Sequence, residues 1–267
     1  MSLKLQIDHV GLLGPGIAEL VDEFSRLGFS VIGPTELTSI DEEGNRVGLG
    51  QYSAHVMFES DYIELTAVER PTPNHHLGHF LQPPWGLRLL LPACDDITAA
   101  HDACTKNELC PSPIQEAART LDYRPGEEAR FRWFGLPGDA WPDVLLAYVS
   151  HLTPELVFDA DVAAHENGAR GLCCLFYIAD ALPGQYALLA AEGKQEIVVV
   201  PPNDAERVLG FDVSRTTPFA GIGINVDDLA VTVALLKRAG IETRATDRSC
   251  TVQLQSGVCV VFTQAAL

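Results

Sequence analysis

The sequence contains no apolar run long enough to cross a bilayer. Apolar residues make up 47% of the 267 positions, but they fall in short runs, whereas a membrane-spanning helix needs roughly 18 to 20 in succession. The N-terminus also lacks a basic segment followed by an apolar one, the pattern of a secretory signal. We therefore expect a soluble, cytoplasmic protein that has no membrane partner and enough apolar material for one large domain or two small ones.

Positive charge is also scarce. The chain has 18 Lys and Arg against 36 Asp and Glu, a formal net charge of −18, and its basic residues are scattered rather than clustered. Such a surface repels the phosphates of nucleic acids and anionic membranes. We expect no nucleic-acid partner and interpret the acidity as a solvated surface.

The cysteines form no recognisable framework. There are seven, an odd number, and none stands in a CxxC pair, so neither a zinc ribbon nor a secreted disulfide scaffold is indicated. No serine or cysteine follows a nucleophile-elbow pattern, and the "GPGI" and "GIGIN" segments lack the glycine spacing and lysine of a phosphate loop. Reduced thiols in a cytoplasmic protein fit best.

One order of elements recurs along the chain: a strand, a helix and then strands. In the first copy, an apolar strand covers residues 5–13, apolar residues at helical spacing follow until Gly28, and strands are predicted at 29–33, 51–59 and 62–68. Further copies begin at residues 87 and 220, and a third, less regular copy begins at 170. Self-similarity of this kind indicates a repeated supersecondary unit.

The repeats predict the domain organisation. We expect an α+β protein of four modules, at residues 1–72, 85–152, 169–217 and 218–267, that pair into curved mixed sheets. Residues 1–152 form the N-terminal half, 153–168 a linker and 169–267 the C-terminal half. The sequence is equally compatible with module pairing inside one chain and with exchange in a homodimer.

Three short motifs carry a family resemblance. The segments "DHV" at residues 8–10, "YIEL" at 62–65 and "HENGARGL" at 165–172, together with the strand, helix and three strands, resemble the vicinal oxygen chelate superfamily and its glyoxalase-like proteins. The resemblance implies βαβββ modules paired into a cup, where His and Glu side chains often hold a divalent metal. The superfamily includes glyoxalase I, ring-cleaving dioxygenases, epimerases, resistance transferases and non-catalytic drug-binding proteins.

The resemblance assigns two metal ligands in this chain. His9 matches the first-strand ligand, and Glu64 matches the last-strand ligand. In the later modules the place of His9 falls on or near non-ligands or weak ligands, namely Leu89, Cys173 and Gly221. The partner modules therefore do not supply their share of the set.

Strand alternation offers a third ligand. If the hairpin turns at Ser60 and Asp61, His55 faces Thr66 across the ladder and shares the more polar face with Glu64. Two histidines and a carboxylate suit Fe, Mn, Ni or Zn, so His9, His55 and Glu64 form the predicted metal site. Two alternatives stay open: a metal-free cup in which Glu64 is the general base, and a relic set that only lines a water-filled cup.

Several other residues are candidates for ligand binding. On the strand at 129–136, alternation predicts that Phe131 and Trp133 pack on the helix, while Arg132 binds an anion and Phe134 stacks on ligand in the cup; an edge or dimer contact is the alternative. His151 is predicted at the pocket mouth. His75, His76 and His79 are interpreted as surface loop residues, and Asn167 with Gly168 as a structural turn.

These patterns predict a protein that binds a small oxygen-rich or aromatic metabolite in its N-terminal half. With a metal it would be a lyase, an isomerase or a ring-cleaving dioxygenase, with Glu64 as a catalytic residue. The alternative is a non-catalytic binding or sequestering protein without metal.

Overall fold

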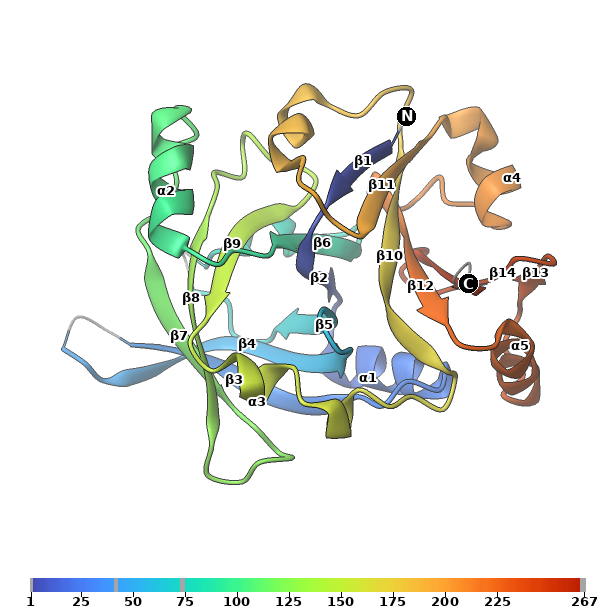
Figure 1. Cartoon of the computed structure of the whole chain (residues 1–267), viewed down its shortest axis with the longest axis horizontal. Coiled ribbons are helices and arrows are strands. Elements are labelled where there is room, and N and C mark those ends of the chain that lie inside the picture. Colours follow the sequence, from blue (N-terminus) through green and yellow to red (C-terminus); the bar gives the residue numbers. More distant parts are fainter. Residues whose placement is uncertain (1, 41–42, 73–74, 265–267) are drawn as a thin grey trace.

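Two sheets lie side by side in the computed structural model, which describes residues 2–40, 43–72 and 75–264 (Figure 1). One sheet is a closed barrel in the order β2-β5-β4-β3-β7-β8-β9-β6, and the other has seven strands in the order β1-β11-β10-β12-β15-β14-β13. The α+β class with curved mixed sheets is therefore confirmed. Within the described part of the chain, no helix is both long and apolar enough to span a bilayer.

The first predicted module forms one half of the barrel. It consists of β2 (Ile7–Leu13), α1 (Ile17–Arg26), β3 (Ile32–Ile40), β4 (Arg46–Met57) and β5 (Tyr62–Val68). Helix α1 buries Ile17, Leu20 and Phe24 on one face, which packs on the outside of β4 and β5. The chain then leaves the helix at Gly28, whose φ of +85° suits glycine.

The second module completes the barrel. It consists of β6 (Gly86–Pro92), α2 (Ile97–Lys106), β7 (Gln115–Thr120), β8 (Glu128–Gly135) and β9 (Leu145–His151). The Asp96 side chain caps α2 by accepting hydrogen bonds from two backbone N–H groups. The first strands of the two modules pair antiparallel, β2 with β6, and the pairing of β3 with β7 closes the ring.

The C-terminal half is less regular. It contains β10 (Ala169–Ile178), β11 (Gln195–Val200), β12 (Phe219–Val226), α5 (Leu229–Arg238), β13 (Arg244–Ala245), β14 (Ser249–Gln253) and β15 (Cys259–Gln264). The last five of these elements repeat the order of the N-terminal modules. The third module keeps only β10 and β11, which run parallel and are joined through the 3-10 turn Gly184–Leu189.

Short helical segments occupy the remaining connections, at α3 (Pro154–Val157), α4 (Ala205–Leu209) and 3-10 turns over Gly78–Phe80, Ala160–Val162 and Pro202–Asp204. The N-terminal strand β1 (Ser2–Leu5) leaves the barrel and pairs antiparallel with β11. Residues 2–5 thus belong to the second sheet, although the predicted N-terminal half included them. The second sheet is thus connected to the barrel twice along the chain, through β1 before the first barrel strand and through the linker after the last one.

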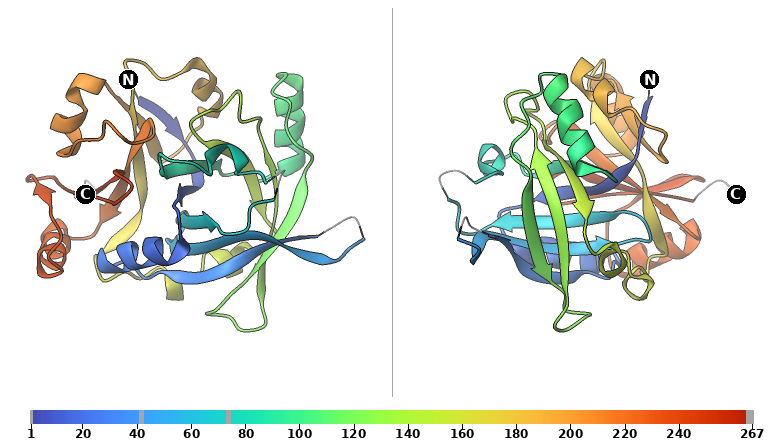
Figure 2. Two further views of the ribbon diagram at one scale, coloured as in Figure 1. Left: turned by 180° about the vertical axis from the view of Figure 1, so that it is seen from behind. Right: turned by 60° about the vertical axis from the view of Figure 1, so that its left-hand side comes forward.

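The barrel and the second sheet lie next to each other (Figure 2), and buried polar contacts connect them. The Asp61 carboxylate accepts hydrogen bonds from the Leu172 N–H (2.9 Å) and from Gln195 Nε2 (3.1 Å). Gln195 Oε1 in turn accepts from the Ile7 N–H at 3.2 Å, at the start of β2. Burial raises the pKa of Asp61 to about 6 despite these two donors. The neighbouring sheet therefore positions β2, the first strand of the barrel.

The "HENG" segment between the halves is a structural turn, as predicted. Gly168 has a φ of +74°, and Asn167 is fully buried. Asn167 Nδ2 donates to the Leu27 carbonyl and its Oδ1 accepts from the Ala169 N–H, both at 3.0 Å. His165 donates from Nε2 to the Met57 carbonyl and accepts the Ser30 N–H at Nδ1. These side chains hold the linker against α1 and the first hairpin.

Replacing Asn167 with Ala is expected to lower the free energy of unfolding by about 2–4 kcal/mol, because two buried backbone groups lose their partners. Urea denaturation followed by circular dichroism measures the change. Glu166→Ala is the matched control, since Glu166 is the preceding residue and its side chain is exposed. Equal stabilities of the two variants would contradict this role of Asn167.

Candidate functional site

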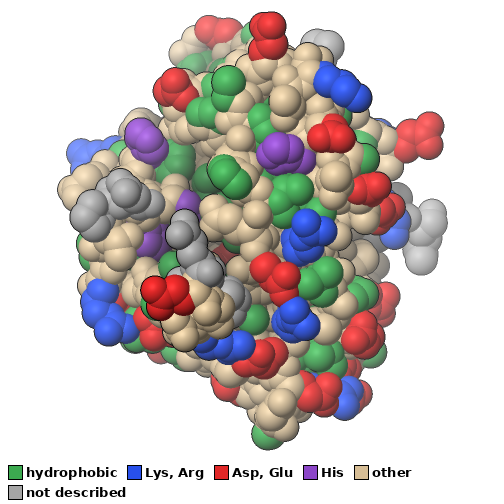
Figure 3. Space-filling view, turned by 90° about the vertical axis from the view of Figure 1, so that its left-hand side faces the viewer, with side chains coloured by type: hydrophobic (Ala, Val, Ile, Leu, Met, Phe, Trp, Pro, Cys, Tyr) green, Lys and Arg blue, Asp and Glu red, His purple; other side chains and the backbone are tan. Residues whose placement is uncertain are grey.

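The interior of the barrel contains a small cavity with two unlike walls. Its volume is about 60 Å³, room for a few water molecules. The first module contributes mostly polar side chains, namely His9, Thr35, Leu37, Gln51, Ser53, His55, Tyr62, Glu64 and His76 with its linker, and the second contributes mostly apolar ones, namely Leu89, Leu91, Phe131, Trp133, Leu145, Ala147 and Val149, with Arg119. Figure 3 views the barrel side of the molecule, where histidines gather near a hollow.

A β-bulge sets the geometry of His9. Across the β2–β6 ladder Ile7 faces Pro92 and His9 faces Leu91, so Asp8 is an extra residue on β2. Strict alternation would send the side chains of Asp8 and His9 to opposite faces, and the bulge relaxes that constraint. Asp8 Oδ1 therefore accepts a hydrogen bond from His9 Nδ1 at 2.7 Å, which directs Nε2 of the same ring toward Glu64.

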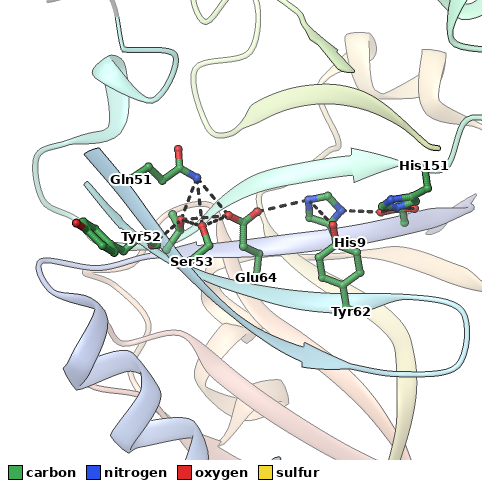
Figure 4. A network of polar contacts seen from close by, with 9 residues as sticks. His9, Gln51, Tyr52, Ser53, Tyr62, Glu64 and His151 are labelled. Atoms are coloured by element: carbon green, nitrogen blue, oxygen red, sulfur yellow. Dashed lines mark hydrogen bonds and ion pairs between the residues drawn. The ribbon is translucent and has the colours of Figure 1, made fainter. Parts of the chain in front are cut away.

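The two oxygens of the Glu64 carboxylate have different partners (Figure 4). Its Oε1 accepts hydrogen bonds from Ser53 Oγ (2.6 Å), Thr66 Oγ1 (3.1 Å) and Gln51 Nε2 (3.2 Å). Its Oε2 lies 3.5 Å from His9 Nε2. Three donors on neighbouring strands thus orient the carboxylate, and its second oxygen faces the histidine.

The buried charges alternate in sign. Burial alone would raise the pKa of Asp8, but hydrogen bonds from His151 and His9 lower it to about 2. Burial would likewise raise the pKa of Glu64, but the hydrogen bond and charge of His9 lower it to about 2. Burial lowers the pKa of His9, yet the two carboxylates outweigh it and raise that pKa. The two carboxylates on either side of His9 therefore favour its protonated form.

An aromatic ring supports the charge on His9. The Tyr62 ring stacks on the imidazole with centroids 4.2 Å apart and planes at 16°. The face of an aromatic ring attracts a cation, and burial keeps Tyr62 neutral by raising its pKa far above the usual value. His55 differs from His9, because burial and then the charge of Arg119 hold its pKa well below the usual value. The two histidines of the cavity therefore have pKa values shifted in opposite directions.

The structure brings the three predicted metal ligands to one wall but does not arrange them as a metal site. His55 faces Glu64 rather than Thr66, because the hairpin turn spans Phe58 to Asp61 and shifts the predicted register by two. His9 uses one ring nitrogen on Asp8 and turns the other to Glu64. Among the described residues, no group of three or more His, Cys, Asp or Glu side chains can hold a metal ion.

The predicted faces of β8 are reversed. Phe131 and Trp133 line the cavity, whereas Phe134 and Arg132 do not. Phe134 is fully buried on the outside, stacked on Tyr148 at 5.1 Å and in edge contact with His101 of α2. Both sides of this strand are covered, one by the barrel contents and one by a helix, so an apolar pattern alone does not distinguish them.

His151 lies behind the cavity rather than at its mouth. Its Nε2 donates to Asp8 at 3.0 Å. His151 therefore adjoins the charge chain, by which we mean the buried series Glu64, His9 and Asp8. His76, interpreted from the sequence as a surface loop residue, lines the cavity, and its ring lies 5.1 Å from that of Trp133. Its neighbour His75 is buried as well.

Sequence reasoning also missed Asp8, Gln51, Ser53 and Arg119. A period of two in Gln51, Ser53 and His55 places them on one face and could have indicated the first wall. The inward position of Asp8 depends on the bulge in β2. The inward position of Arg119 depends on the pairing of β3 with β7, which closes the barrel. No pattern within the segment "QEAART" marks its arginine as inward-facing.

The charge chain predicts a pH dependence of stability. The contributions of Asp8 and Glu64 are present above their ordinary pKa values, 3.8 and 4.5, and are lost as the pH falls through about 2. The contribution of His9, whose pKa is raised from 6.5, is complete below 6.5 and is lost as the pH rises beyond it. Asp8→Asn should reduce the acid loss between pH 4.5 and 2 by roughly 2 kcal/mol. Denaturant unfolding at each pH measures it, with exposed Glu59→Gln as control; parallel acid limbs for wild type and Asp8→Asn would contradict the assignment.

Comparison with known proteins agrees with this architecture. A search of curated proteins finds no match. Among solved structures, a hypothetical protein from Staphylococcus aureus superimposes with a TM-score of 0.67 at 7% identity, covering 98% of this chain and 100% of the other. A 4-hydroxymandelate synthase variant from Streptomyces coelicolor gives 0.55 at 12% identity, covering 99% and 95%. A xylose isomerase-like TIM barrel/4-hydroxyphenylpyruvate dioxygenase fusion protein gives 0.57 at 14% identity, covering 100% of this chain and 50% of that one.

These similarities establish only the fold, because their sequence identities are low. The family assignment rests on a sequence profile. The profile of the glyoxalase-like domain matches residues 7–192, which include the whole barrel, the strand β10 and the 3-10 turn Gly184–Leu189. The barrel of paired βαβββ modules and the placement of His9 and Glu64 on the first and last strands of one module agree with it. The chain therefore belongs to the glyoxalase-like domain family.

Proposed function

We propose that the barrel binds a small amphiphilic molecule that carries a carbonyl group, and that Glu64 and His9 exchange protons with it. The observation that carries the proposal is that Glu64 Oε2 and His9 Nε2 face each other at 3.5 Å, with the Tyr62 hydroxyl also 3.5 Å from His9 Nε2. One is a proton acceptor and the other a proton donor, and both belong to residues that line the cavity. A carbonyl compound with an acidic neighbouring C–H matches such a pair.

The proton step requires the ion pair to open. In the empty cavity Glu64 is a weak base, because His9 lowers its pKa to about 2. A ligand between the two groups removes that hydrogen bond and leaves burial as the dominant influence, which raises the pKa of the carboxylate. Glu64 then removes a proton from carbon while His9 Nε2 donates one to the carbonyl oxygen, which forms an enol. Return of a proton from Glu64 to the same carbon, with return of the enol proton to His9 Nε2, regenerates the carbonyl compound and completes exchange or inversion at that carbon.

The apolar wall provides the rest of the site. Trp133, Phe131 and the leucines of β6 and β9 oppose the polar wall. They exclude water from the Glu64–His9 pair, which strengthens the electrostatic interactions there, and they accept the hydrocarbon part of a ligand. Because the cavity is small, a ligand of aromatic size displaces the His76 ring from Trp133.

Exchange of carbon-bound protons tests the proposal. The probes are phenylacetone, a neutral ketone, and 2-oxobutanoate, a small keto acid, each incubated with the protein in D2O and followed by proton NMR. Wild type is expected to accelerate deuterium uptake next to the carbonyl of at least one probe. Glu64→Gln should slow that exchange by about 100-fold or more, the usual contribution of a general base.

Glu59→Gln is the control, since it lies at the end of the same hairpin with an exposed side chain and should exchange like wild type. Binding of a probe without exchange would favour the non-catalytic sequestering alternative. Equal exchange by wild type and Glu64→Gln would contradict the role of Glu64.

Metal-dependent lyase, isomerase or ring-cleaving dioxygenase chemistry is the second candidate. The orientation of His9 by Asp8 favours it, since a carboxylate on one ring nitrogen typically accompanies metal binding by the other. The incomplete ligand set in this arrangement weighs against it.

Calorimetric titration with Fe²⁺ under anaerobic conditions and with Mn²⁺, Ni²⁺ and Zn²⁺, combined with elemental analysis, separates the candidates. Under the primary proposal, exchange activity survives chelator treatment and no ion binds at one equivalent in a manner that depends on His9. Stoichiometric binding that His9→Ala and Glu64→Ala both abolish would instead establish the metal-dependent function.

A further inference from the structure

Arg119 is a buried cation without a counter-ion in the barrel wall. It lies on β7, is 6% exposed, and lines the same cavity as Glu64 and His9. No carboxylate among the described residues lies within ion-pair distance of its guanidinium, although seven other arginine–carboxylate pairs occur in the described chain. Its Nη2 is buried and has no hydrogen-bond partner.

The groups around Arg119 do not neutralise it. The phenol of Tyr123 interacts with it, and the charge of Arg119 together with a hydrogen bond opposes the rise in the phenol pKa that burial causes. A phenol with a raised pKa stays uncharged at neutral pH. The neighbouring His55 is neutral because its pKa is lowered, in part by Arg119 itself. A desolvated charge without a partner is costly, so the cation and its free N–H donor indicate a site for an anion.

We infer that Arg119 binds the carboxylate of a small organic acid, so that the ligand of the barrel is an acid with an apolar body. This inference rests on the proposed binding site and defines the class of molecule that occupies it. A carboxylate is planar and matches the fork of a guanidinium with two parallel hydrogen bonds. The body of the acid lies against Trp133 and Phe131 of β8, the strand paired with β7.

A phosphate fits less well. It carries more negative charge than a carboxylate, and the cavity already holds the carboxylate of Glu64, with Asp8 behind His9. The single positive charge of Arg119 suits an anion with one charge.

The test compares benzoate with its neutral isostere benzamide, and with phenyl phosphate, by isothermal titration calorimetry on the full chain. Wild type is expected to bind benzoate at least 10-fold more tightly than either of the others. Arg119→Met should weaken benzoate binding by about 10- to 100-fold, the range expected for a hydrogen bond to a charged group, and leave benzamide binding unchanged. Arg119→Lys, which keeps the charge but loses the planar fork, should fall between.

Arg132→Met is the matched control, because Arg132 lies on the adjacent strand outside the cavity lining and should bind benzoate like wild type. A thermal melt adds a readout that a structural role would move in the other direction. Since Arg119 lacks an ionic partner, Arg119→Met without ligand should melt at or above the wild-type temperature, and a clear decrease would indicate a structural role and overturn the inference.

The two proposals fail in different ways. Equal affinity for benzoate and benzamide, or a preference for phenyl phosphate, overturns the carboxylate inference and leaves the binding site intact. Loss of the benzoate preference in Arg132→Met also overturns it. Absence of binding by all three aromatic probes, together with no exchange of phenylacetone or 2-oxobutanoate, counts against the barrel site as a whole.

Discussion

A protonated histidine enclosed between two carboxylates is the interaction on which the barrel interior depends. Three charged side chains out of water are expensive unless each has a partner and its remaining donors and acceptors are satisfied. Asp8 meets this condition through His9 and His151, and Glu64 meets it through His9 and the donors on β4 and β5. The arrangement constrains the register of four strands at once, because its members lie on β2, β4, β5 and β9.

This constraint explains the unequal use of the two modules. Both contribute four strands to one barrel, yet the charged chain occupies one wall and the opposite wall is almost wholly apolar. Module duplication could have supplied two equivalent sets of polar groups, but a second buried set would double the cost of desolvation in a cavity of this size. The apolar wall instead lowers the local dielectric constant around the first set and strengthens it.

Much of the fold could be predicted from the sequence, because local patterns determine it. The helix α1, the strand β5 and the "HENG" turn follow from helical spacing, alternation and glycine chemistry, and each agrees with the structure. The site depends on less local features. The register of the first hairpin shifted by two because the four residues from Phe58 to Asp61 form its turn, and β8 was assigned the wrong inward face because both of its faces are buried. Family resemblance identified His9 and Glu64, but only the bulge shows that Asp8 completes the chain.

The C-terminal half has a supporting role that the repeat pattern did not indicate. Its third module has lost the helix and two strands of the common order, and the free edge of β11 is covered by β1, which precedes the barrel in the sequence. The sheet then meets the barrel through Asp61 and Gln195, next to the start of β2. Because β2 carries both Asp8 and His9, any displacement of the sheet would move the charge chain. A reduced module that positions this strand is therefore sufficient, and no second cup is needed to keep the first one in register.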